Sequence, residues 1–223
     1  LETELEGLKA AGDTEKLDQA RSDFESFLDR VRERDQLDYN SLLWIGETYL
    51  GLGNGVRDQR DVAAPYFARA GEAFQQMLDE KLVEKQFVNA IKLRLVKCRT
   101  AQRKYQDAVS MAQEILTESE LLLEGQFEAA RSLAEWGADP GGEPDKLKEA
   151  IGGIKVGEQR VIWGYGYLAK RLGQTRNQPE WEQLRSQYLD ARYEIANCRL
   201  KYFQTGAADG KKVLETAAGE LRL

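Results

Sequence analysis

Apolar residues recur at intervals of three and four positions along almost the whole chain. An α-helix places such positions on one face, so this spacing is typical of amphipathic helices packed against a core. The pattern predicts an all-α fold of about nine or ten helices, over residues 17–31, 42–52, 62–82, 85–103, 105–117, 121–136, 144–151, 158–172, 180–204 and 210–223. Residues 91–97 alternate like a β-strand, but no turn residues isolate them, so we expect helix there.

Helix-breaking residues fall between these segments. Residues 137–144 hold two prolines and three glycines, which cannot propagate a helix. Pro65 and Pro179 are each expected in the first turn of a helix, where the missing N–H is harmless. Thr117 and Glu120 have the spacing of a capping box, which predicts a helix start just before Leu121.

The chain contains an internal similarity between two parts. Residues 120 positions apart match in type and spacing: Leu42, Ile45, Gly46, Leu52 and Gly53 against Ile162, Tyr165, Gly166, Leu172 and Gly173. The sequence therefore predicts N-terminal helical repeats over 1–136, a Pro/Gly-rich linker with a short helix over 137–157, and C-terminal helical repeats over 158–223. We expect these parts to form one continuous array.

Small and apolar residues also repeat within the second helix of each predicted pair, with a spacing of four and then three positions. They are Ala63, Phe67 and Ala70; Ala108, Ala112 and Ile115; and Leu214, Ala218 and Leu221. This pattern resembles the tetratricopeptide repeat, a helical pair of about 34 residues. The repeat lengths vary here, and the usual proline after the second helix is missing. Residues 126–137 and 161–166 are similar to the repeat region of large bacterial tetratricopeptide-containing proteins, many of them exported or envelope-associated.

The resemblance implies an α-solenoid that binds proteins or peptides and carries no chemistry of its own. First helices of such repeats line a concave face, and helical phase selects the residues expected to point into it. The candidate binding residues are Glu47, Lys97, Trp163, Tyr167, Lys170, Arg171, Asn197 and Lys201. Because four of these eight residues are Lys or Arg and only one is acidic, an acidic partner peptide is the expectation.

Composition excludes several classes of function. The 223 residues carry a net charge of −6, which disfavours nucleic acid as the main ligand. Mean hydropathy is −0.59, and no apolar run approaches the ~18–20 residues that span a bilayer. The chain has no histidine, which removes His-based catalysis and His-bearing metal sites. We therefore expect no catalytic residue, no metal and no cofactor.

The remaining candidates for chemistry each have an ordinary structural explanation. Cys98 and Cys198 stand among apolar helix positions and are expected in the core. Residues 206–212 superficially resemble a phosphate-binding loop, but the spacing is one residue short and no strand precedes it, so a turn between helices is expected. The carboxylate runs predict solvated helix faces.

Residues 85–104 carry seven basic side chains and no acidic one, whereas the neighbouring segments are acidic. Two interpretations remain open. The basic charges are either neutralised by packed acidic helices or exposed as a stripe for an acidic peptide or an anionic surface.

The leading functional hypothesis is a non-enzymatic scaffold that binds a protein or peptide. The alternative is a helical enzyme or small-ligand sensor with a polar pocket between the two halves, and a third possibility is a structural spacer. The chain begins at Leu1 without methionine and ends within a predicted helix, so we expect a piece of a larger bacterial protein. The residues themselves predict no compartment; the resemblance alone points to the cell envelope or export.

Overall fold

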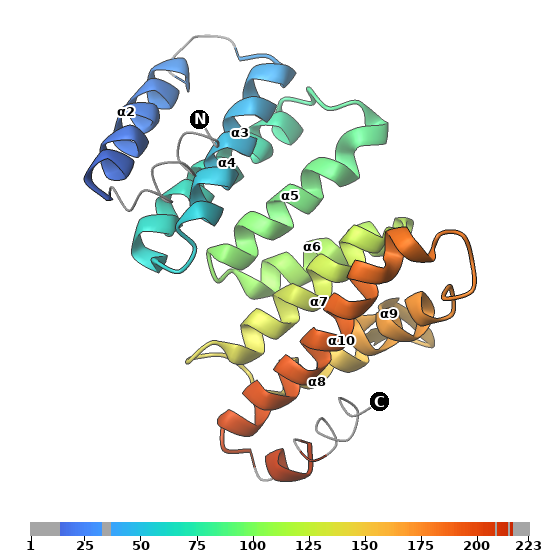
Figure 1. The fold of residues 1–223 in the computed structure, drawn as a ribbon. Coiled ribbons are helices and arrows are strands. Elements are labelled where there is room, and N and C mark those ends of the chain that lie inside the picture. The colour runs from blue at the N-terminus through green and yellow to red at the C-terminus, as the bar shows by residue number, and fades with distance from the viewer. Residues whose placement is uncertain (1–13, 33–36, 208, 214, 216–223) are drawn as a thin grey trace. The chain divides into compact units, whose positions relative to one another are not determined.

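The computed structural model describes residues 14–32, 37–207, 209–213 and 215 (Figure 1). These residues contain nine α-helices, one 3-10 helix and one two-stranded sheet, which confirms the all-α prediction of about nine or ten helices. Contacts divide the chain into two compact units, Leu1–Lys85 and Gln86–Leu223. Most of the predicted helix over 210–223, with Leu214, Ala218 and Leu221, lies outside the described residues.

The first unit contains α2 (Thr14–Arg32), α3 (Tyr39–Gly55) and α4 (Arg60–Asp79). Asp38 begins α3, because its carboxylate accepts a hydrogen bond from the Ser41 backbone N–H at 2.8 Å. α3 packs closely against α4 at Gly46, where an added Cβ would lie 2.5 Å from the Phe74 ring. A glycine is therefore required for this approach of the two helices.

The second unit continues the chain as a group of helices around one core. Its elements are η1 (Lys85–Phe87), α5 (Val88–Ala101), α6 (Tyr105–Glu118), α7 (Leu123–Ala138), α8 (Asp145–Gly152), β1 (Ile154–Val156), β2 (Gln159–Ile162), α9 (Gly164–Gly173) and α10 (Trp181–Gln204). Consecutive helices pack in pairs from α5 to α7. The long α10 then runs back across α9, α8 and α7, as the orange-red helix of Figure 1 shows.

The Pro/Gly-rich residues 137–157 lie within the second unit. They include the end of α7, a turn around Gly142, and α8, which packs against α7, α9 and α10. Residues on both sides of this segment contribute to the same core, in which Leu147 and Ala150 of α8 are fully buried.

A β-hairpin replaces the first part of the predicted helix over 158–172. β1 pairs antiparallel with β2, with Lys155 opposite Arg160, and α9 begins only at Gly164. Gly157 in the turn and Gly164 at the start of α9 have φ angles of +62° and +69°, which other residues adopt at a cost. Gly157 therefore permits the turn of the hairpin, and Gly164 separates the hairpin from the helix; the apolar periodicity carries neither signal.

Other local predictions have mixed outcomes. Residues 91–97 are helical, within α5, as expected. α4 begins at Arg60, so Pro65 lies in its second turn and not in its first. The capping box is wrong: Leu122 is the N-cap of α7, and the Thr117 hydroxyl donates to the Gln113 carbonyl oxygen within α6.

The core prediction for the two cysteines is confirmed. Both side chains are buried, Cys98 on α5 and Cys198 on α10. Burial, with the nearby charge of Glu194, raises the pKa of Cys198 to about 12. A thiol held neutral in this way is a packing residue and a poor nucleophile.

The contact between α3 and α4 yields a stability prediction. We expect Gly46→Ala to destabilise the first unit by about 1–3 kcal/mol, because the new methyl group overpacks against Phe74. Urea unfolding followed by circular dichroism measures this loss. Gly55→Ala is the matched control, since a Cβ there meets nothing within 4 Å. An unchanged midpoint for Gly46→Ala would contradict the close approach.

Candidate functional site

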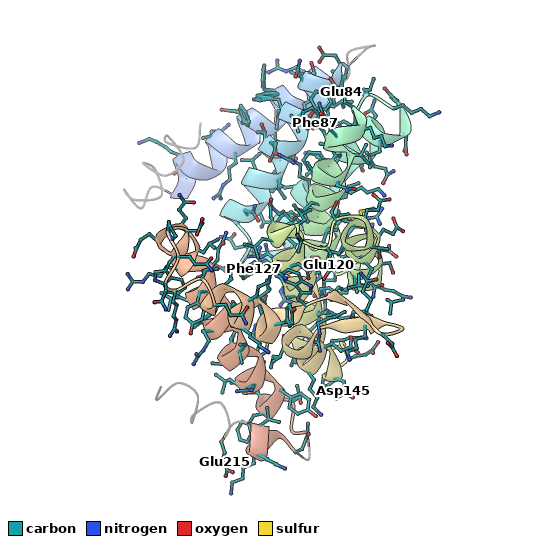
Figure 2. All side chains as sticks on the ribbon, turned by 90° about the vertical axis from the view of Figure 1, so that its right-hand side faces the viewer. Glu84, Phe87, Glu120, Phe127, Asp145 and Glu215 are labelled. Carbon is teal, nitrogen blue, oxygen red and sulfur yellow. The ribbon has the colours of Figure 1, made fainter. Side chains whose placement is uncertain are left out.

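The long helix α10 organises the candidate site, because its buried stripe leaves both flanks of the helix at the surface. Tyr188, Ala191, Ile195, Cys198 and Tyr202 form that stripe. On one flank, α10 and α7 enclose a cavity of about 610 Å³, which we call the acidic groove. Phe127 of α7, labelled in Figure 2, lines this groove with Tyr165 of α9, and their ring centroids are 6.3 Å apart.

Carboxylates dominate the charge of the acidic groove. Its acidic lining residues are Glu124, Glu135, Asp190 and Glu194, and its basic ones are Arg131 and Lys201. Arg131 donates to the nearly buried Glu128 carboxylate at 3.1 Å, so its charge is already balanced beneath the surface. Glu124 is likewise paired, with Lys97 at 2.7 Å. The other three acidic lining residues outnumber Lys201, so the lining still carries net negative charge.

Burial raises the pKa values of two groups beneath the groove, and the charge of Glu194 adds to both shifts. Burial is the main reason that the pKa of Tyr165 is raised well above its ordinary value, and the Glu194 carboxylate adds to the effect. Glu194 also raises the pKa of Cys198, after burial. Asn197 fixes this carboxylate by donating an Nδ2–H bond to it at 3.0 Å.

Apolar and amide groups complete the acidic groove. Tyr193 lines it with 66% of its surface exposed, and Leu189 and Leu200 are exposed on the adjoining face of α10. The Gln187 side-chain oxygen is buried at the groove, with no hydrogen-bond partner among the described residues. Such an oxygen is an acceptor for a donor that a ligand brings.

Gln126 is fully buried on α7 and anchors the chain that leads from β2 to Tyr165 of the acidic groove. Its Nε2 donates to the carbonyl oxygens of Val161, at 3.0 Å, and Glu120, at 2.9 Å. Its Oε1 accepts the Trp163 backbone N–H at 2.8 Å. A two-stranded sheet leaves one edge of each strand without backbone partners. Gln126 supplies partners for the Val161 carbonyl oxygen and the Trp163 N–H at that edge of β2.

The structure distributes the eight predicted binding residues over several places. Asn197 and Lys201 line the acidic groove together. Lys97 of α5 reaches the groove through an ion pair of 2.7 Å with Glu124. Glu47 is exposed on α3 in the first unit, and Lys170 lines a different cavity on the other flank of α10.

The other three predicted residues form one cluster on and before α9. The rings of Trp163 and Tyr167 lie 5.3 Å apart, and the Arg171 guanidinium lies 4.6 Å from the Trp163 ring. Trp163 is only 2% exposed, and its Nε1–H donates to the Glu120 carboxylate at 3.3 Å. This tryptophan is therefore buried in the core, although the sequence places it among the candidate binding residues.

Several of the basic side chains in residues 85–104 form ion pairs with acidic side chains of neighbouring segments. Lys92 pairs with Glu114 of α6, Lys97 with Glu124 of α7, and Arg103 with Asp139 just after α7. Of the two interpretations left open, these contacts favour neutralisation by neighbouring acidic helices. Each exposed pair contributes little stability but removes positive charge from the surface.

Sequence reasoning missed the carboxylates and aromatic residues of the acidic groove. Asp190, Glu194, Asn197 and Lys201 are spaced by four, three and four residues, which places them on one flank of α10. That spacing was visible in the sequence. Its partner face on α7 was not, because which helix packs beside α10 depends on the tertiary fold.

Neither a metal-binding cluster nor a membrane-spanning helix is found among the described residues. Within this part of the chain, no group of three or more Cys, Asp or Glu side chains converges in a way that could hold a metal. Among the same residues, every helix is too short or too polar to cross a bilayer.

Comparison of the chain with known protein families, with curated proteins and with solved structures found no match.

The Gln126 contacts yield a second stability prediction. We expect Gln126→Leu to lower the free energy of unfolding of the second unit by about 1–3 kcal/mol for each buried backbone group left without a partner. Chemical denaturation monitored by tryptophan fluorescence measures the loss, since Trp163 adjoins the site. Gln106→Leu, at an exposed position on α6, is the matched control and should be close to neutral. Equal stability of the two variants would show that Gln126 does not hold β2.

Proposed function

We propose that the second unit is a non-enzymatic module that binds a partner protein, and that the acidic groove takes a basic, partly apolar segment of that partner. The observation that carries this proposal is the groove itself, which has three carboxylates besides the paired Glu124 and an exposed tyrosine along α7 and α10. The proposed charge of the partner is opposite to the sequence-based expectation, because Lys97 is already paired with Glu124.

The shape and lining of the groove support a peptide as ligand. A cavity of about 610 Å³ accommodates a few side chains of a bound segment. Carboxylates on both walls suit Lys or Arg, and the exposed Tyr193 offers an aromatic face to an apolar or cationic side chain. The Gln187 oxygen adds an acceptor for a backbone or side-chain N–H.

We propose further that the chain is a tetratricopeptide-like scaffold. The packing of consecutive helices supports this proposal, with small residues at the contacts: Gly46 between α3 and α4, and the buried Ala108 and Ala112 on α6. The hairpin β1–β2 and the short α8 depart from a simple succession of helical pairs.

The test is binding of the whole chain to matched synthetic peptides that share their apolar positions and differ in carrying Lys/Arg, Asp/Glu or neutral residues elsewhere. We expect only the basic peptides to bind, with affinity falling as salt screens the charges. Asp190→Lys combined with Glu194→Lys should weaken this binding about tenfold or more, since two attractive contacts become repulsive.

The control variant combines Glu118→Lys with Glu158→Lys, which changes the net charge equally at exposed positions outside the groove. It should retain binding of the basic peptides. Any one of three results would contradict this proposal: stronger binding of the acidic peptides, an equal loss of affinity in both double variants, or no binding of any of the three peptide classes. Fluorescence anisotropy with labelled peptides gives all of these affinities.

A further inference from the structure

The opposite flank of α10 carries a second cavity with the reverse charge. This cavity, of about 500 Å³, lies between α9 and α10, and we call it the basic groove. Four cationic side chains line it: Lys170, Arg176, Arg192 and Arg199. Among its described lining residues there is no Asp or Glu, although the chain as a whole is acidic.

Tyr188 brings two of these cations together. Its hydroxyl oxygen accepts a hydrogen bond from Arg176 and another from Arg192, the latter at 3.2 Å. The shared oxygen places two positive charges close together, and an anion beside Arg176 would be attracted by both. A guanidinium has five N–H donors, so one bond to Tyr188 leaves Arg176 able to donate to a ligand as well.

Aromatic rings fix the position of Arg176. Its guanidinium lies 4.7 Å from the centroid of the Tyr188 ring and 5.7 Å from that of Trp181. The two rings are themselves 5.4 Å apart. Stacking of this kind restricts an exposed arginine before a ligand arrives, which lowers the entropy lost on binding.

A glycine on α9 allows this arrangement. A Cβ at Gly173 would lie 3.3 Å from the Tyr188 ring, so a larger residue would press on the tyrosine that holds both arginines. Tyr188 is 8% exposed and thus largely fixed by packing. The groove is consequently built on two helices, and its cations do not depend on a loop alone.

We propose that the basic groove binds a small organic phosphate, a molecule of about nucleotide size with one or more phosphate groups. Arginine pairs with phosphate oxygens through two parallel N–H bonds, and a doubly charged phosphate suits several cations better than a single carboxylate does. The groove is larger than a phosphate alone requires, which leaves room for the organic part beside the Tyr188 ring.

This site is separate from the acidic groove, so the two proposals can fail independently. Tyr188, Arg192 and Arg199 occupy one flank of α10, whereas Asp190, Glu194 and other residues of the acidic groove occupy the opposite flank. Basic peptides should bind without competition from a phosphate ligand of this size.

The test is calorimetric titration of the whole chain with inorganic pyrophosphate and with a nucleoside diphosphate, using sulfate as the control for simple anion binding. We expect saturable binding of both phosphate probes, tighter for the nucleotide. Arg176→Gln combined with Arg192→Gln should weaken it about tenfold or more. Arg185→Gln, an exposed arginine of α10 outside the groove, should leave it unchanged.

Melting of each variant without ligand, followed by circular dichroism, shows whether it folds. If the double variant does not fold, Lys170→Gln at an exposed position of α9 replaces it and should weaken binding several-fold, because one exposed charge contact is lost. Three results would overturn the proposal: no binding of either phosphate probe, equal affinity for sulfate, or equal weakening by Arg185→Gln. Binding of a phosphoserine peptide without binding of the nucleotide would overturn the assignment to a small molecule.

Discussion

The second unit depends on one buried amide, that of Gln126. Its three hydrogen bonds join α7 to the end of β2 and to the chain just before α7. A two-stranded hairpin has unpaired backbone edges, and in an apolar core such groups are costly unless something bonds to them. Because Gln126 supplies both a donor and an acceptor, the hairpin can lie against α7 and direct the chain into α9. Tyr165 of the acidic groove follows Trp163 by two residues, so these hydrogen bonds help to place it.

The two flanks of α10 carry surfaces of opposite charge. Its buried stripe faces the core, while Asp190 and Glu194 lie on one flank and Arg192 and Arg199 on the other. A helix can separate its charges in this way because residues three or four apart share a flank, whereas residues two apart do not. The net charge of −6 therefore describes neither groove. Each groove has a local potential set by the side chains that line it.

Pairing between helices decides which charges remain effective at the surface. Lys97 is one of the basic binding candidates of the sequence, yet Glu124 of α7 lies 2.7 Å from its amine. Arg131 is likewise balanced by Glu128, three residues before it on the same helix. Arg176 differs, because its described partners are a neutral hydroxyl and two aromatic rings, none of which cancels its charge. This difference separates a cation that serves packing from one suited to a ligand.

Most of the helices and much of the core could be predicted from the sequence. Periodic apolar positions predicted α2 to α8 and α10, and they indicated that Cys98 and Cys198 are buried. This works because residues three and four positions apart lie on the same face of a helix, and that face packs into the core. It did not locate the hairpin, where Gly157 and Gly164 turn the chain inside a segment of helical appearance. Which charged residues lie together depends on the tertiary fold. Glu124 pairs with Lys97, and α10 packs against α7 and α9, through contacts between residues far apart in the chain. Such contacts depend on how whole helices pack, and no local spacing encodes that packing.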